Sequence, residues 1–344
     1  MTATTTVLEQ GSATDVVLRV RELTVEFPVG KSMVQPVRNV SLTLKRGARL
    51  GLVGESGSGK SLTALALMRL VPAPGAVSGQ VLLGERDLME LSEREMAPLR
   101  GSRIAMIYQD PMSALNPVFT VGRQISEAVR LATGAGRKQA TERAADLLAE
   151  VGVPDPRRRM HSYPHEFSGG MRQRVVIAMA LAGEPDVVVA DEPTTALDVT
   201  TQAKIIDLFG SLVDRHGLSV VLITHDLGVA ASFCDEINVM YAGRVVERAA
   251  VTELFHRPVH PYSEGLLSSI CTMDADVHTP IRGIPGQPPL PGDLPTGCSF
   301  SPRCPMATER CHDETPRPVS LGLREAECLY AVQRLDPADG ESRT

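Results

Sequence analysis

The pattern of apolar and polar positions divides the chain into short buried strands and amphipathic helices. Apolar runs bounded by glycine or charged residues predict strands at 50–53, 103–108, 186–190 and 219–224, the last being the final buried strand expected. Runs rich in β-branched residues predict further strands at 16–18, 23–25, 40–44 and 79–83. Helical periodicity predicts helices at 62–70, 121–131, 138–151, 175–181 and from about 199, and residues 110–117 are expected to form a loop. The order of these elements predicts an α/β fold.

The sequence GESGSGKS follows the strand at 50–53 and opens onto a helix. Gly54, Gly57 and Gly59 allow the backbone to curl so that N–H groups face an anion, and the positive end of the helix adds to the attraction. Lys60 is placed to reach the terminal phosphates of a nucleotide, and Ser61 is the expected Mg²⁺ ligand. The predicted binding stretch also includes Glu55, Ser56, Ser58 and Leu62. A flexible turn that contains glycine and lysine by chance is the alternative.

Polar residues stand at the carboxyl ends of three predicted strands, where ligands collect in sheets of this class. Gln109 is a candidate for contact with Mg²⁺ or the attacking water. Asp191 is expected in the Mg²⁺ shell, and Glu192 is expected to polarise a water for attack on a γ-phosphate. His225 is predicted to contact the γ-phosphate, although a lone histidine after a strand is more often structural.

Two further features point to a nucleotide. Ser168, Gly169 and Gly170 begin a helix with a capping hydroxyl and free N–H groups, a second arrangement that receives anions. A capped helix with no ligand is the alternative. Phe27 is placed to stack on adenine, with ordinary core packing as the competing interpretation.

Composition limits the partners of the 344-residue chain. The net charge is −6 and no extended basic stripe is present, which argues against nucleic acid. The N-terminus lacks the basic and apolar pattern of a secretory signal, so we expect a cytoplasmic protein. No window approaches the ~20 apolar residues of a membrane helix. A role at a membrane would therefore come through partners.

Taken together, these motifs and the Ala-Leu-Asp at 196–198 resemble an ABC transporter nucleotide-binding subunit over about residues 16–255. The resemblance implies a P-loop NTPase cassette with a RecA-like core, an antiparallel β subdomain and a helical subdomain at about 112–182. Residues 1–15 and 335–344 are expected to be flexible ends. ATP and Mg²⁺ are the implied cofactors.

The resemblance also implies a composite site shared by two subunits. Within one subunit, Phe27 stacks on adenine, Gln109 senses Mg²⁺ and signals to the membrane partner, Glu192 is the general base and His225 holds the γ-phosphate. Ser168 and Gly170 would cap the γ-phosphate bound by the opposite subunit, and Asp198 would link the two sites. The expected partners are two transmembrane permease subunits and a second ABC ATPase, as a heterodimer in preference to a homodimer, with an extracytoplasmic solute-binding protein acting indirectly.

The segment at 256–334 resembles the C-terminal region of oligopeptide and dipeptide permease ATPases. The sequence IYQDPMSALNP around Gln109 also resembles these ATPases. This predicts a subunit at the cytoplasmic face of the membrane that energises import of di- or oligopeptides. Nickel, glutathione and antimicrobial peptides are the alternative cargoes. A soluble ABC ATPase that acts on DNA or ribosomes, and a metal-cluster protein with relic ATPase motifs, are the alternative classes. The first class would show a basic surface, a long coiled-coil insertion or a second cassette, and none is visible in the sequence. The intact Lys60, Asp191, Glu192 and His225 argue against the second class.

Cys298, Cys304, Cys311 and Cys328 fall within thirty-one residues of one another, the first three of them in the proline-rich segment at 281–318. Four thiolates suit a [4Fe–4S] cluster, and the resemblance to peptide permeases implies one at this place. Zinc and free thiols are the alternatives, and the spacings lack the close C-x-x-C pairs that are usual in zinc sites. Cys234 and Cys271 lie outside the group and are expected to be plain thiols.

Overall fold

A mixed sheet of eight strands forms the centre of the computed structural model, which describes residues 15–195, 197–269 and 283–335. In spatial order its strands are β11 (Val319–Leu321), β12 (Arg324–Ala326), β10 (Arg244–Ala250), β9 (Glu236–Tyr241), β3 (Arg49–Val53), β8 (Ser219–Thr224), β7 (Val187–Asp191) and β6 (Ile104–Ile107). The four buried strands predicted from apolar runs are confirmed as β3, β6, β7 and β8, and they pair in parallel. Their carboxyl ends therefore meet at one edge of the sheet.

The prediction that β8 is the final buried strand is wrong. β9 follows it, pairs in parallel with β3 and is buried along most of its length. Glu236 and the fully buried Asn238 interrupt its apolar run, which is why the pattern does not mark it as a strand of the core. β9 lies between β3 and β10, on the side of β3 opposite β8.

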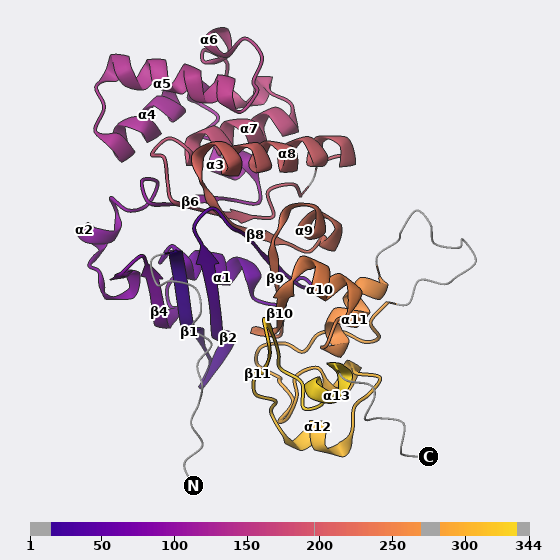
Figure 1. Ribbon diagram of the computed structural model, residues 1–344. Coiled ribbons are helices and arrows are strands. Elements are labelled where there is room, and N and C mark those ends of the chain that lie inside the picture. The colour runs from indigo at the N-terminus through magenta and orange to yellow at the C-terminus, as the bar shows by residue number, and fades with distance from the viewer. Residues whose placement is uncertain (1–14, 196, 270–282, 336–344) are drawn as a thin grey trace.

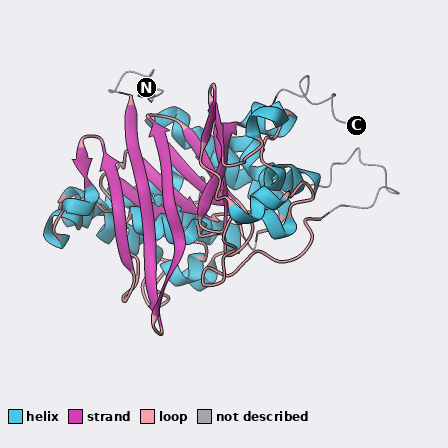
Figure 2. Ribbon diagram, turned by 90° about the horizontal axis from the view of Figure 1, so that it is seen from below, coloured by secondary structure: helices cyan, strands magenta, loops and turns pink. Residues whose placement is uncertain are grey.

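A second sheet of four antiparallel strands lies beside the first (Figures 1 and 2). It comprises β2 (Ser32–Lys45), β1 (Val16–Val29), β4 (Ala76–Leu83) and β5 (Arg86–Asp87). The strands predicted at 16–18 and 23–25 are one strand, whose register shifts between Val20 and Leu23 where Glu22 adopts a positive φ of 50°. The strand predictions at 40–44 and 79–83 are confirmed by β2 and β4.

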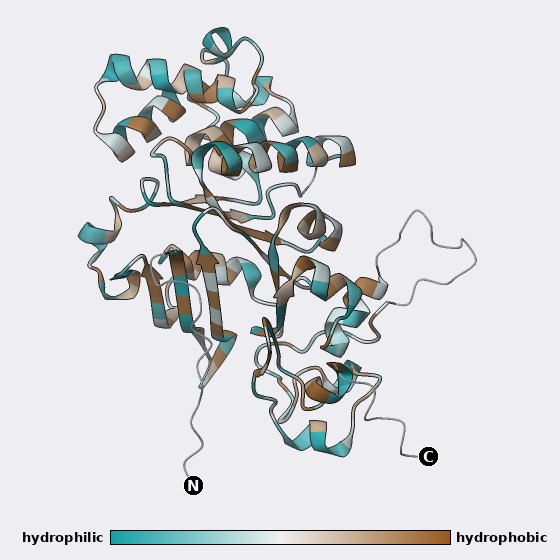
Figure 3. Ribbon diagram, in the orientation of Figure 1, coloured by the Kyte–Doolittle hydropathy of each residue, from teal (hydrophilic) through white to brown (hydrophobic). Residues whose placement is uncertain are grey.

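Helix α1 (Lys60–Leu67) joins the two sheets in one core. Its Ala64, Ala66 and Leu67 share a buried cluster with apolar residues of β1, β2 and β4 and with residues of β7 and β8. Hydrophobic colour follows the inner strands, whereas the outer helices carry hydrophilic stretches (Figure 3). In the described residues, none of the helices combines the length and the apolar character that a membrane crossing requires.

Helices from the middle of the chain pack together above the main sheet in Figure 1. They are α3 (Pro111–Ala114), α4 (Val121–Thr133), α5 (Arg137–Glu150), α6 (Pro156–Arg159) and α7 (Gly169–Ala180), with a 3₁₀ turn at Pro164–Glu166. The expectation of a loop at 110–117 is wrong for α3, because Asp110 caps Met112 and Ser113 and Pro111 occupies the first helical position. α7 begins six residues before the predicted start, so the two glycines are helical.

Helices α8 (Val199–His216) and α9 (Leu227–Phe233) pack on the main sheet, and η1 (Leu88–Glu90) and α2 (Glu93–Met96) follow the antiparallel sheet. The C-terminal region contributes α10 (Val251–His256), α11 (Pro261–Ser268), η3 (Ser301–Arg303), α12 (Glu309–Asp313) and α13 (Ala331–Leu335). Two of the contacts that join it to the cassette lie at the edge of the main sheet and around Tyr241. β12 pairs with β10, and Tyr262 and Phe300 pack around Tyr241 at ring-centroid distances of 4.5 and 5.2 Å.

Candidate active site

The glycine-rich loop between β3 and α1 has a backbone that only glycine permits at two close approaches. Gly54 and Gly59 have φ of 156° and 103°, and a Cβ atom on them would lie 2.1 Å from the Met240 carbonyl oxygen and 2.5 Å from that of Pro36. Gly57 adopts a φ of 80°, which is also unfavourable for other residues. The loop is therefore held in the curled form expected of an anion-binding nest, at the carboxyl edge of the main sheet.

Lys60 is the first residue of α1 and is almost fully buried, at 4% exposure. Its Nζ donates to the carbonyl oxygens of Gly54 and Glu55, both at 2.8 Å. Burial lowers the pKa of Lys60, while the carboxylates of Glu192, Asp191 and Glu55 oppose that shift. The Lys60 ammonium thus bridges two carbonyl groups of its own loop, inside the curve where a phosphate would lie.

Two of the three residues predicted to bind Mg²⁺, Ser61 and Asp191, are in direct contact, and the third, Gln109, bonds to Glu192. Ser61 Oγ donates to Asp191 Oδ1 at 3.0 Å, which joins the start of α1 to the end of β7. Burial raises the pKa of Asp191, Glu192 raises it further, and Ser61 and Lys60 lower it. A hydroxyl and a buried carboxylate at one point are oxygen ligands of the type that Mg²⁺ takes.

Glu192 lies at the centre of a hydrogen-bonded group that also holds two predicted site residues. Its carboxylate accepts from Gln109 Nε2 at 3.0 Å and from Thr195 Oγ1 at 2.8 Å, and His225 Nδ1 lies 3.1 Å from Oε1. The backbone of Glu192 is left-handed at a φ of 46°, and its N–H donates to Ile223. Burial raises the pKa of Glu192, but the bonds from Thr195 and His225 outweigh it and lower the pKa.

Thr195 was not predicted as a site residue, although it follows Asp-Glu by only three positions. A hydroxyl one turn after a strand-end carboxylate is the sequence signal that marks it. Because its bond favours the ionised form of Glu192, it keeps that side chain able to accept a proton at neutral pH.

The predicted γ-phosphate cap forms the exposed start of α7. Ser168 is the N-cap and accepts from Met171 N at 3.4 Å, and Gly169 and Gly170 follow it. A Cβ atom on Gly170 would lie 2.4 Å from Thr201 Cγ2 of α8. Asp198 caps α8 and accepts from Thr201 N at 2.9 Å and from Thr201 Oγ1 at 2.7 Å. Among the described residues, the hydrogen bonds of Ser168 and Asp198 stay within their own helices.

The remaining predicted residues of the phosphate loop differ in their surroundings. Ser58 is buried and its carbonyl accepts from Gly243 N at 2.9 Å, whereas Ser56 is exposed and Leu62 is half-buried. Glu55 is held by Tyr262 and Arg303, two C-terminal residues that were not predicted. Ala196 lies outside the described residues.

Phe27 is half-buried in β1 and packs on the core of the antiparallel sheet, where its ring would lie 2.7 Å from a Cβ on Gly75. This packing matches the core interpretation, and its contact with adenine stays a prediction.

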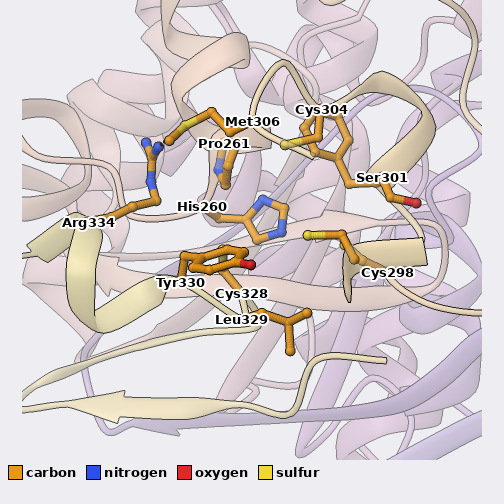
Figure 4. Close-up of a pocket in the computed structure, with 12 residues that line it drawn as sticks. His260, Pro261, Cys298, Ser301, Cys304, Met306, Cys328, Leu329, Tyr330 and Arg334 are labelled. Carbon is orange, nitrogen blue, oxygen red and sulfur yellow. Dashed lines mark hydrogen bonds between the residues drawn. The ribbon is translucent and has the colours of Figure 1, made fainter. Parts of the chain in front are cut away.

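The four grouped cysteines line one small cavity in the C-terminal region, with His260 and Phe300 (Figure 4). Burial raises the pKa of Cys298 to about 11 and also raises that of Cys304 and Cys328. In the described residues, no three His, Cys, Asp or Glu side chains are grouped closely enough to hold a metal ion. This finding gives no support to either the predicted [4Fe–4S] cluster or the zinc alternative, so both stay predictions. Cys234 is a buried thiol, as predicted, and Cys271 lies outside the described residues.

Comparison with known proteins matches two parts of the chain. Residues 37–195 match the family described as ABC transporter, and residues 246–311 match the oligopeptide/dipeptide transporter, C-terminal region. The probable peptide ABC transporter ATP-binding protein y4tR of Sinorhizobium fredii is 49% identical over 90% of this chain and 93% of its own length. The oligopeptide transport ATP-binding protein OppD of Salmonella typhimurium is 44% identical over 97% of this chain and all of its own length.

Among solved structures, the dimeric post-hydrolysis structure of the ATP-binding cassette MJ0796 bound to ADP and Pi is similar at a TM-score of 0.61. It is 29% identical, and the match covers 68% of this chain and 98% of that cassette. The fold is that of an ATP-binding cassette.

Proposed function

The chain belongs to the ABC transporter family, in the group of peptide-transport ATP-binding proteins, and from that premise we propose that it hydrolyses ATP to drive a membrane importer of di- or oligopeptides. The observation that carries the ATPase activity is the meeting of Lys60, the Ser61–Asp191 pair and Glu192 at one sheet edge. The peptide cargo rests on relatives named for peptide transport.

In the proposed reaction, the backbone N–H groups of the glycine-rich loop and Lys60 hold the phosphates of ATP. Ser61 and Asp191 would hold Mg²⁺, which neutralises phosphate charge when bound. Glu192 accepts a proton from water while the water oxygen bonds to the γ-phosphorus. The bond from that phosphorus to the β–γ bridging oxygen breaks, and the products are ADP and phosphate.

Gln109 and His225 both reach Glu192, at 3.0 and 3.1 Å. In the proposed reaction, Gln109 orients the carboxylate and the water, and its position before α3 lets it report on the γ-phosphate to the helices. His225 is 58% exposed at its side chain and would contact the γ-phosphate as well as Glu192. Both residues therefore link the state of the nucleotide to the proton acceptor.

The exposed Ser168–Gly170 cap and Asp198 are proposed to act on ATP held by a second ABC ATPase subunit. A helix N-terminus with a capping hydroxyl favours an anion, and this one has none within its own described chain. The dimeric structure of the similar cassette MJ0796 supports pairing. We propose a heterodimer on two permease subunits at the cytoplasmic face of the membrane, supplied by an extracytoplasmic solute-binding protein.

The test is assembly and coupling. Affinity purification of the full chain from its own cells should recover a second ATPase and two polytopic membrane proteins. In proteoliposomes, peptide-loaded solute-binding protein should raise ATP hydrolysis and drive peptide accumulation. Hydrolysis stimulated by nickel or glutathione in place of peptide would assign one of the other cargoes, and a purification that recovers no membrane protein would overturn the importer.

For the cysteine cavity, we propose a [4Fe–4S] cluster held by Cys298, Cys304, Cys311 and Cys328. The convergence of the four residues on one cavity supports it. The four thiolates would hold the irons of the cluster, since cysteine thiolates are the ligands of clusters of this kind. Protein prepared without oxygen should absorb visible light and contain iron, and Cys304→Ser should lose both. The control Cys234→Ser should keep them, and a colourless parent would refute the cluster.

A further inference from the structure

Two side chains of the C-terminal region, Arg303 and Tyr262, bind the phosphate-binding loop at Glu55. Arg303 Nη1 and Nη2 donate to the two carboxylate oxygens of Glu55 at 2.6 and 3.0 Å, a two-point ion pair. Tyr262 Oη accepts from the Glu55 backbone N–H at 2.9 Å. These partners lie 248 and 207 positions away in sequence, so the C-terminal region reaches the nucleotide site directly.

Both gripping side chains are fixed on the C-terminal side. The Arg303 side chain is only 4% exposed, its Nε donates to the Pro285 carbonyl at 2.9 Å, and its guanidinium lies 5.8 Å from the centre of the Tyr241 ring. Tyr262 is fully buried against that same ring. Because these anchors are packed and hydrogen-bonded, they can hold Glu55 with little freedom of movement.

The position of Glu55 decides the position of Lys60. The Glu55 carbonyl accepts from Lys60 Nζ at 2.8 Å and from Ser58 N at 3.2 Å, so a shift of Glu55 moves the groups that line the phosphate nest. The Glu55 carboxylate is also a negative charge next to a site for phosphates. The guanidinium of Arg303, paired with both carboxylate oxygens of Glu55, neutralises that charge.

We propose that Arg303 and Tyr262 are positioning residues of the nucleotide site, which makes the C-terminal region part of the ATP-binding machinery. The proposal rests on the proposed binding of ATP by this loop. It assigns the C-terminal region a task that does not depend on what the neighbouring cysteines hold.

The test measures the Kd of a non-hydrolysable ATP analogue, together with KM and kcat for ATP, on full-length variants. Arg303→Met should raise Kd and KM about tenfold, because it releases the loop and leaves the Glu55 charge uncompensated, and should change kcat less. Tyr262→Phe keeps the packed ring and should raise Kd by a smaller factor. Adding Glu55→Gln to Arg303→Met should recover most of the lost affinity, since the repelling charge is then gone.

The matched control is Glu327→Gln. Glu327 is a buried carboxylate of the same region in a two-point pair with Arg244 on β10, at 2.7 Å for both bonds. Its variant should keep the Kd of the parent. Equal Kd values for the parent, Arg303→Met and Tyr262→Phe would overturn the proposal while leaving ATP binding intact. A parent that binds no nucleotide would instead refute the proposed function. Should Arg303→Met fail to fold, the Kd values of Tyr262→Phe and Arg303→Lys replace it as the test of the proposal.

Discussion

The two anion-receiving ends of this cassette differ in what surrounds them. The loop at the start of α1 is closed by its own chain, with Lys60 at 4% exposure and Ser61 bonded to Asp191. The start of α7 is open, because Ser168 and Gly169 are exposed and Ser168 bonds only within its own helix among the described residues. One end is thus enclosed by its own chain, and the other is open to a partner.

This difference explains why a single chain would bind ATP but hydrolyse it poorly. In the proposed reaction, the buried end would supply the phosphate contacts and the proton acceptor from one polypeptide. The exposed end can act only when another nucleotide-bound subunit faces it. Hydrolysis then removes the γ-phosphate contacts that favour the pair, and opening follows.

The largest effect is expected from Glu192→Gln at the buried end. Loss of the proton acceptor should lower kcat roughly 10²- to 10⁴-fold, while ATP binding stays close to that of the parent. Phosphate release under saturating ATP measures the first quantity and equilibrium binding the second. Glu236→Gln, at the opposite end of the main sheet, is the control and should hydrolyse normally. Normal turnover by Glu192→Gln would assign the proton acceptor elsewhere.

Lys60→Ala should weaken nucleotide binding itself by roughly hundredfold, since charge-assisted contacts to the phosphates are lost. It also removes the bonds to Gly54 and Glu55 that hold the loop. Calorimetric titration of the full chain with ATP and Mg²⁺ provides the measurement. An unchanged Kd would show that the nucleotide lies at another place.

Ser168→Ala should affect the function of the exposed start of α7 without affecting that of the buried loop at α1. ATP binding to the isolated chain should be unaffected, whereas nucleotide-dependent association should weaken roughly tenfold through loss of a hydrogen bond to a charged group. Loss of the N-cap should also lower the free energy of unfolding by about 1 kcal/mol. Association is measured by analytical ultracentrifugation and stability by urea unfolding. An equal loss of ATP affinity in the monomer would show that Ser168 contributes to the ATP site of its own chain, which contradicts the proposed difference between the two ends.

The smallest effect is expected from Thr195→Val. The ionised form of Glu192 accepts the proton, and it is present above the pKa of that carboxyl, which the Thr195 bond lowers. Removing the bond raises this pKa, so the acid limb of the kcat–pH profile should move to higher pH by less than about one unit. Thr141→Val, on the exposed face of α5, should leave the profile unchanged. A shift to lower pH would contradict the assigned role of Thr195.

Much of the cassette could be predicted from the sequence because its signals are local. Each parallel strand found in advance is a short apolar run, and Gln109, Asp191, Glu192 and His225 follow such runs directly. The curled loop is marked by glycines that the structure shows to be necessary at Gly54 and Gly59. Local patterns and the fold agree at these positions, so the catalytic edge could be placed before its geometry was known.

What could not be predicted depends on contacts between distant segments. Asn238 is a buried polar residue of β9, and it interrupts the apolar run by which a core strand is recognised in a sequence. The pairing of β12 with β10 and the grip of Arg303 on Glu55 join residues tens to hundreds of positions apart. Residues 283–335 show no helical or strand periodicity along most of their sequence. They are held in place by the packing of Phe300 on Tyr241 and by the pairing of β12 with β10.

The most direct measurement is the molar mass of Glu192→Gln in solution with and without ATP, alone and with the companion ATPase, by ultracentrifugation. We predict a dimer that forms with ATP, is absent with ADP, and is weakened by Ser168→Ala. A mass that stays monomeric with ATP in every combination would contradict the composite site.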